Sequence, residues 1–347
     1  MKTQGFGLSA DALYQRMVRA AGRSLAYAKR PRGERWRAWQ KRLRAKLVEL
    51  LALPPSPARP PQVRFVETVP CDGYTRRRGY MTARDGLAVP FYLLEPEAGP
   101  TPRGVCLAVH GHGPGKELPA GIPESEKGRQ LVAEGERDYG VQAAREGYLT
   151  IVPDMRGMGE LVLREDSAKN QGSCYQLACR SLQLGKPLLG QRVSDMRQLL
   201  DWALARRDVD ARRVVMTGAS GGGTMTLFTS AVDERIKAAA PAVYFCTFAD
   251  SILAMHHCIC NFVPGLQEVA EMSDLAGLIA PRPLLIVAGT KDEIFPIDAV
   301  RRGCAEAQRI YADAGAADKL QLFEAPGGHR YYARPVWEFF RRALPKT

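Results

Sequence analysis

The chain has 347 residues, of which 46% are hydrophobic and 25% are charged, which is typical of a soluble globular protein with one large α/β domain or two ordinary ones. Its net charge is +12, but basic and acidic residues are interspersed after about residue 60 and no nucleic-acid-binding motif is present. We therefore expect no nucleic-acid partner, and the lack of any apolar run of about 18 residues excludes a membrane span.

The eight cysteines give a further expectation about the compartment. They contain no C-x-x-C pair, and a chain of this size does not need disulfides, so a reducing compartment fits. The first 23 residues have no continuous apolar core and no small-residue cleavage site, unlike a secretory signal. The sequence therefore predicts a cytoplasmic protein.

The first predicted element is a helix in the basic stretch 29–53. Its apolar residues recur at helical spacing, at Trp36, Trp39, Leu43, Leu47 and Leu50. A helix on a membrane surface or on a partner is one interpretation, and we favour the other, a helix docked on the main domain with a solvated basic face. Prolines in 53–61 end the helix and form a stiff linker. The domains predicted are an N-terminal helical extension with a Pro-rich linker, 1–61, and a main domain, 62–347.

Beyond the linker, strands and helices alternate. QVRFVETVP and LAVPFYLLEP read as two antiparallel strands joined through Arg84-Asp85-Gly86. Further apolar strands are expected in GVCLAVHGHG, YLTIVPDMRGMG, RVVMTG, IKAAAPAV, PLLIVAG and KLQLFEA. This alternation predicts an α/β fold with a mostly parallel, eight-stranded sheet covered by helices on both faces. Two segments, 160–190 and 246–270, break the rhythm, and we expect them to be excursions that line the site.

The strand RVVMTG runs into the glycine-rich turn GASGGGT. Such a turn either cradles a dinucleotide phosphate or forms a nucleophile elbow that exposes Ser220. The phosphate interpretation is weaker, because Thr224 replaces the last glycine of that motif and several strands precede the turn. In addition, no tyrosine of the chain has a lysine four residues later, as the corresponding reductase chemistry needs. We therefore interpret the turn as an elbow.

A serine hydroxyl becomes a good nucleophile when a histidine accepts its proton and an acid orients that histidine. Of the five histidines, His329 lies in a glycine-rich loop just after the last predicted strand. The acid is expected at the end of the preceding strand, where Asp292 stands. Glu293 and Asp298 are alternatives, although Asp298 falls inside the next predicted helix. The predicted catalytic residues are Ser220, Asp292 and His329.

Ester or amide hydrolysis also requires donors for the oxyanion of the tetrahedral intermediate. The backbone N–H of Gly221 follows the nucleophile directly and is the first candidate. The second is expected in the loop after GVCLAVHGHG, from the N–H of His112 or, alternatively, of Gly113. The ring of His110 is interpreted as a support for this loop.

The segment HHCICNFVPG contains four potential zinc ligands, His256, His257, Cys258 and Cys260. Adjacent histidines and a C-x-C pair rarely converge on a tetrahedral ion without a distant further partner. We therefore predict no metal and no cofactor, and expect this segment to form the substrate-pocket wall through His257, Cys258 and Phe262.

With these residues in place, 62–347 resembles the α/β-hydrolase superfamily, in its dienelactone hydrolase-like and acetyl xylan esterase branch. The resemblance is carried by PDMRGMGE, LLDWALARRDVDARRVVMTGASGGG, LIAPRPLLIVAGTKDEIFP and HHCICNFVPGL. In the first motif, Asp154 and Arg156 are expected to hold the loop by ion pairing. The chain departs from dienelactone hydrolases proper, which have a cysteine where Ser220 stands, and from acetyl xylan esterases, which have glutamine where Gly221 stands.

Together, the residues and the resemblance imply a serine carboxylic ester hydrolase that forms an acyl-enzyme on small-molecule esters, including acetylated carbohydrates. An amidase or peptidase with the same triad is the alternative among enzymes. A non-catalytic binding protein on the same fold is the alternative of another class. The sequence is compatible with a monomer or with an oligomer.

Overall fold

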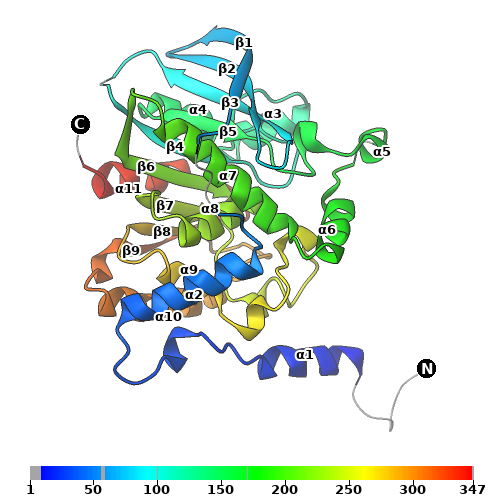
Figure 1. Cartoon of the computed structure of the whole chain (residues 1–347), viewed down its shortest axis with the longest axis vertical. Helices are drawn as coiled ribbons and strands as arrows, with labels where there is room; N and C mark the ends of the chain where they lie inside the picture. Colours follow the sequence, from blue (N-terminus) through cyan, green and yellow to red (C-terminus); the bar gives the residue numbers. More distant parts are fainter. Residues whose placement is uncertain (1–8, 56–58, 100, 170, 346–347) are drawn as a thin grey trace.

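The computed structural model describes residues 9–55, 59–99, 101–169 and 171–345. Within these residues, one sheet of nine strands has the order β1-β2-β3-β5-β4-β6-β7-β8-β9 (Figure 1). The strands are β1 (Val63–Cys71), β2 (Tyr74–Thr82), β3 (Ala88–Pro96), β4 (Arg103–Val109), β5 (Leu149–Pro153), β6 (Val209–Ala219), β7 (Ala238–Ala242), β8 (Leu284–Gly289) and β9 (Leu320–Ala325). From β5 to β9 all neighbouring strands are parallel, whereas β1, β2 and β3 pair antiparallel at one edge. The mostly parallel sheet is confirmed.

The strand count differs from the predicted eight because β2 lies between the two expected edge strands. β1 and β3 both pair with β2, and the turn at 84–86 joins β2 to β3. Three consecutive arginines hide the strand pattern of β2 in the sequence. Two of their guanidinium groups lie over aromatic rings. That of Arg77 is 3.8 Å from the ring centroid of Phe65, and that of Arg76 is 5.5 Å from the ring centroid of Tyr92.

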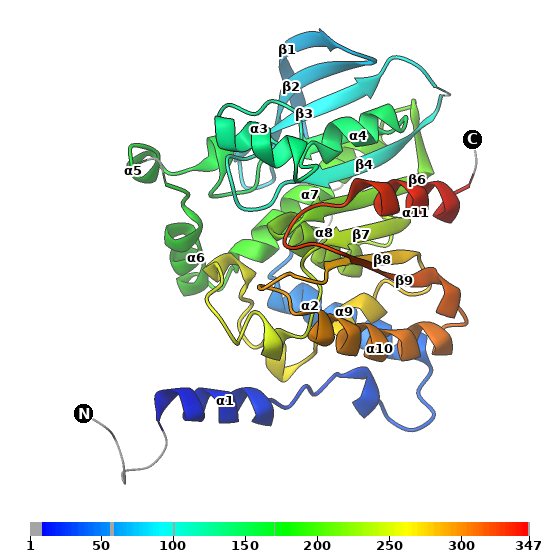
Figure 2. The same ribbon diagram turned by 180° about the vertical axis from the view of Figure 1, so that it is seen from behind.

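Helices cover both faces of the sheet, as expected for a parallel sheet. They are α1 (Ala10–Ala20), α2 (Trp36–Leu50), α3 (Glu126–Ala133), α4 (Tyr139–Arg145), α5 (Arg164–Ser167), α6 (Cys174–Gln183), α7 (Leu188–Leu204), α8 (Gly221–Val232), α9 (Met272–Gly277), α10 (Ile297–Asp313) and α11 (Ala333–Ala343). The core on one face includes buried side chains of α2 and of α7 to α10, while α4 and α11 pack on the other face (Figure 2). No described helix has the length and apolarity needed to cross a bilayer.

The basic helix α2 is docked on the main body, as the sequence analysis favoured. Trp39, Leu43 and Leu47 are buried in the same core as the strands. The side-chain amide of Gln40 donates to the carbonyls of Gly277 (2.7 Å) and Ala280 (2.8 Å). In contrast, α1 has no buried residue. Part of the Pro-rich linker, 56–58, lies outside the described residues, and the domain boundary at residue 61 stays a prediction.

The two predicted excursions meet each other in space. The first contains α5 and α6, and the second contains short 3-10 turns, of which η4 (Ile259–Asn261) contacts α6 (Figure 1). Ser173, directly before α6, donates its backbone N–H to Gly157 (2.9 Å), which ties the start of this helix to the loop after β5. The excursions therefore form one local assembly beyond the ends of the strands.

Candidate active site

Ser220 occupies a sharp turn between β6 and α8. Its backbone has φ 58° and ψ −119°, a conformation that non-glycine residues rarely adopt and that marks a nucleophile elbow. The turn packs closely on the end of β4, because a Cβ at Gly218 or Gly222 would overlap the carbonyl oxygen of Val109. The glycines thus serve close packing around a serine that is itself only partly buried.

His329 and Asp292 meet at the ends of two neighbouring strands. Nδ1 of His329, in the loop after β9, lies 2.8 Å from Oδ2 of Asp292, in the loop after β8. The Asp292 side chain is 1% exposed, and its other oxygen accepts the N–H groups of Ile294 (2.9 Å) and Phe295 (3.2 Å). These bonds hold the carboxylate in one orientation towards the imidazole. The ring of Phe295 stacks on that of His329, with centroids 5.9 Å apart.

The alternative acids are placed elsewhere. Asp298 lies in the first turn of α10, is largely exposed and pairs with Arg301 at 3.0 Å. Glu293 is exposed. The structure therefore brings Asp292, of the three acids considered, to His329.

Ser220 and His329 line one cavity of about 130 Å³. His112 and Gly113, the candidates for the second oxyanion donor, line the same cavity. A Cβ built on Gly221 would lie 3.5 Å from the backbone nitrogen of His112, so the two favoured N–H groups belong to adjoining backbone segments. An oxyanion that develops beside Ser220 would therefore form close to both of these N–H groups, which are the predicted donors.

The ring of His110 supports the loop that carries His112. Its Nδ1 lies 2.7 Å from the carbonyl of Gly111, and its Nε2 accepts the N–H of Met155 (3.0 Å). Burial lowers the pKa of His110 to about 4, so the imidazole is neutral at pH 7. The predicted supporting role agrees with these bonds.

Asp154 and Arg156 form ion pairs, although their partners lie outside the predicted loop. Asp154 is fully buried and bonds the ammonium of Lys116 at 2.9 Å. Arg156 binds both oxygens of Asp195 at 2.7 Å and also bonds Asp85 at 2.6 Å. The two side chains therefore fasten the loop after β5 to separate parts of the fold.

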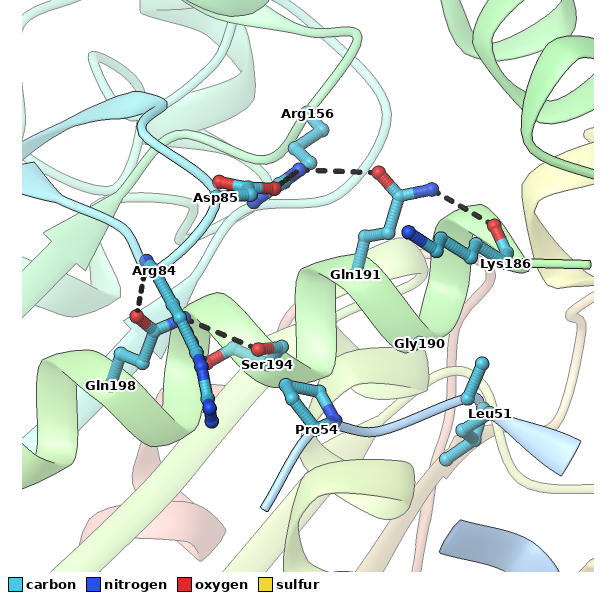
Figure 3. A pocket seen from close by; sticks show the side chains of 11 residues that line it. Leu51, Pro54, Arg84, Asp85, Arg156, Lys186, Gly190, Gln191, Ser194 and Gln198 are labelled. Carbon is cyan, nitrogen blue, oxygen red and sulfur yellow. Dashed lines mark hydrogen bonds and ion pairs between the residues drawn. The ribbon is translucent and has the colours of Figure 1, made fainter. Parts of the chain in front are cut away.

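A larger cavity, of about 200 Å³, lies between α7 and the residues after α2 (Figure 3). Its polar side chains bond one another, as where Arg156 contacts both Asp85 and Gln191. Its described lining contains Ser194 but no histidine, so it lacks a base that would activate a nucleophile. The predicted nucleophile and base, Ser220 and His329, both line the smaller cavity.

Sequence reasoning missed most of the wall of the catalytic cavity. Leu131, Arg137 and Tyr139, from the segment between β4 and β5, line it. Arg137 donates to the carbonyl of His329 at 3.1 Å, and Arg330 pairs with Glu136 at 2.8 Å. The sequence shows only a helical pattern here, since no local signal reveals which loop will face a distant histidine.

The predicted pocket residues lie near the site but not on its cavity. His257 bonds Ser251 through Nε2 (3.1 Å) and packs on Phe295, whereas Phe262 lines a separate cavity of about 40 Å³. Cys258 faces Cys260, with the sulfur atoms 3.2 Å apart. In η4 the segment lies against α6, and the cavity wall is formed instead by residues of 114–139. The role of His257, Cys258 and Phe262 as a substrate wall stays a prediction.

The two cysteines of this segment do meet distant partners. Nε2 of His112 lies 3.1 Å from Sγ of Cys260, and the thiol of Cys174 joins them, so that all four ligand atoms lie within 4.8 Å of one another. His256 and His257, also considered as ligands, are not part of this cluster. The reason given above for expecting no metal, the lack of a distant partner, therefore does not hold.

Comparisons with solved structures show that other proteins share this fold. The chain is similar to the crystal structure of a "putative acetyl xylan esterase" from Bacteroides fragilis NCTC 9343, with 20% identity and a TM-score of 0.78 over 99% of this chain and 92% of that one. It is also similar to a glucuronoyl esterase from Solibacter usitatus, with 17% identity and a TM-score of 0.68 over 93% and 97% of the two chains.

The chain is also similar in sequence to a protein described as a hydrolase. "Putative hydrolase YtaP" of Bacillus subtilis (strain 168) is 28% identical over 252 residues, which are 69% of this chain and 77% of that protein. The model of the Abhydrolase family matches residues 2–324, which include the strands β1 to β8 and the elbow at Ser220. Since this match spans most of the sequence, the chain belongs to the Abhydrolase family, the α/β-hydrolases.

Proposed function

We propose that the protein is a serine carboxylic ester hydrolase. The observation that carries the proposal is the shared cavity, where Ser220 on its elbow and His329, oriented by Asp292, face the same space. Three residue types in these roles are what acyl transfer to a serine requires.

The acylation step follows from these positions. The Ser220 hydroxyl attacks the ester carbonyl while His329 takes its proton, and Asp292 stabilises the imidazolium. The N–H groups of Gly221 and of His112 or Gly113 stabilise the oxyanion. His329 then returns the proton to the departing alcohol, which leaves Ser220 acylated. Water activated by His329 attacks the acyl-enzyme, frees the acid and restores the hydroxyl.

The size of the cavity supports a short acyl group. About 130 Å³ is below the range of roughly 300–1,000 Å³ that holds larger ligands, so an acetyl group fits better than a long chain. Of the similar structures named above, one is described as a "putative acetyl xylan esterase" and the other as a glucuronoyl esterase. We therefore propose acetyl esters, including those of carbohydrates, as the substrate class.

Covalent labelling tests the serine mechanism directly. A fluorophosphonate is expected to add once to the intact protein, because the activated Ser220 oxygen attacks phosphorus and the adduct resembles the tetrahedral intermediate. Intact mass before and after incubation measures it, and peptide mapping locates it. The Ser220→Ala variant is the matched control. An unlabelled wild-type chain, or a label that persists in the variant, would reject this mechanism.

A series of p-nitrophenyl esters tests the acyl group. We expect kcat/KM for the acetate to exceed that for the octanoate by roughly tenfold or more, because extra methylenes overfill a small cavity. Initial rates over a range of substrate concentrations give the ratio. A higher kcat/KM for the octanoate would show that the acyl chain extends outside this cavity, and would overturn the proposed substrate class while leaving the mechanism intact.

A further inference from the structure

Three cysteines and one histidine converge beside the catalytic cavity from three separate parts of the chain. His112 follows β4, Cys174 begins α6, and Cys258 and Cys260 lie at η4. Their ligand atoms all lie within 4.8 Å of one another, and Sγ of Cys260 lies 3.2 Å from Sγ of Cys258 and 3.1 Å from Nε2 of His112. Segments this far apart in sequence do not bring four such side chains together through local structure alone.

The spacing suits a tetrahedral ion. Zinc binds thiolate sulfur at about 2.3 Å and imidazole nitrogen at about 2.0 Å, so ligand atoms around it lie roughly 3.5–3.8 Å apart. The distances between ligand atoms in the cluster lie on both sides of these values. His112 Nε2 to Cys260 Sγ is 3.1 Å, Cys258 Sγ to Cys260 Sγ is 3.2 Å, and no pair of ligand atoms is more than 4.8 Å apart. We propose that Cys174, Cys258, Cys260 and Nε2 of His112 bind one zinc ion.

The surrounding charge fits the same ion. A zinc ion with three thiolates and a neutral imidazole carries one net negative charge, and soft thiolates favour zinc over magnesium or calcium. Arg192, which is 2% exposed, places its Nη2 3.1 Å from Sγ of Cys174. It also donates to the backbone carbonyl of Arg156. The guanidinium thus balances the net charge and donates a hydrogen bond to a ligand sulfur.

The ligands are held in place by bonds that lie outside the cluster. The carbonyl oxygen of the Asn261 side chain accepts the hydroxyl of Thr224, in α8, at 3.0 Å, and its amide donates to the backbone carbonyl of Cys258 at 3.2 Å. The start of α6 is tied to Gly157 through Ser173. Supported ligands lose little freedom on binding, which favours a site formed before the ion arrives. His112 is exposed, which gives the ion a path from solvent.

Four protein ligands leave no open position for a water molecule, so the ion would be structural. It would join the two excursions to the loop after β4. It would also fix the ring of His112, whose backbone N–H is a candidate oxyanion donor, and in this way connect the cluster to the cavity. The proposal requires no step of the ester hydrolysis to pass through the metal.

Metal analysis of the full chain tests the site without any assay of activity. Protein without a histidine tag is reduced, stripped with a chelator and titrated with Zn²⁺ or Co²⁺ alone. We expect one zinc per chain by elemental analysis, and Co²⁺ should give thiolate-to-metal charge-transfer absorption that added Zn²⁺ removes. Failure of the reduced wild-type chain to bind stoichiometric metal would overturn the proposal. A disulfide between two of these cysteines, found by intact mass in place of the ion, would also overturn it.

Serine substitutions locate the ligands. Cys260→Ser and Cys174→Ser are expected to weaken the Co²⁺ charge-transfer band, because one of three thiolates is removed, and to bind zinc at least about tenfold more weakly. Cys179→Ser is the matched control, because Cys179 is an exposed residue of the same helix as Cys174 and lies outside the cluster. Equal zinc affinity in all three variants would place any bound metal elsewhere. Circular dichroism confirms that each variant is folded before it is compared.

Discussion

Replacement of Ser220 by alanine is expected to lower kcat for p-nitrophenyl acetate by about 10⁴-fold or more. The variant removes the oxygen that becomes acylated, and no other group on the cavity takes its place. The cavity and the oxyanion donors remain, so a residual rate above that in water is expected. Steady-state kinetics of purified protein, with protein concentration checked by absorbance, measure the loss.

Ser230→Ala is the matched control for this experiment. Ser230 lies in α8, the same helix that begins after Ser220, and its buried hydroxyl has no hydrogen-bond partner among the residues that the structure describes. Its removal therefore breaks no bond, and kcat should stay within about twofold of the wild type. A Ser220→Ala variant with nearly full kcat, in protein free of contaminating esterase, would contradict the proposed nucleophile.

Asp292→Asn is expected to lower kcat by about 10⁴-fold while the fold is kept. The amide presents a donor where the imidazole N–H of His329 needs an acceptor, so the wrong tautomer of the histidine faces Ser220. The other side-chain oxygen of residue 292 can still accept the N–H groups of Ile294 and Phe295. The rate of p-nitrophenyl acetate hydrolysis and the melting temperature separate loss of catalysis from loss of structure.

Asp298→Asn removes the same charge only six residues away in sequence. Its carboxylate is exposed and contacts Arg301, so wild-type kcat is expected within about twofold. If the Asp298 variant lost activity and the Asp292 variant kept it, the acid of the triad would have to be reassigned.

The residues proposed for catalysis could be predicted because their signals are local. Ser220 directly follows β6, and Asp292 and His329 lie in the loops after β8 and β9. Because parallel strands present their carboxyl ends at one edge of the sheet, chain order alone predicts that these residues lie near one another. The docking of α2 was equally local, since the spacing of Trp39, Leu43 and Leu47 defines its buried face.

Other features depended on tertiary structure. The strand β2 was missed because its arginines lie over aromatic rings contributed by neighbouring strands, which its own sequence does not reveal. The cavity wall at Leu131, in α3, and at Arg137, just after α3, belongs to a segment whose path is set by distant packing. Only two of the four residues in the cysteine cluster, Cys258 and Cys260, are close in sequence and could be recognised from a local motif. The other two, Cys174 and His112, come from other parts of the chain.

Glu136 and Arg137 hold the chain at His329, the proposed base, through the side chain of Arg330 and the carbonyl of His329. The same short segment also borders the space that a substrate would enter. If His329 is the base, as proposed, the segment that positions it is therefore also a segment that contacts the substrate. Replacing residues 114–139 by the corresponding segment of a relative, in order to change specificity, would therefore also remove the contacts that hold His329. The replacement would have to keep an acid and a guanidinium equivalent to those of Glu136 and Arg137.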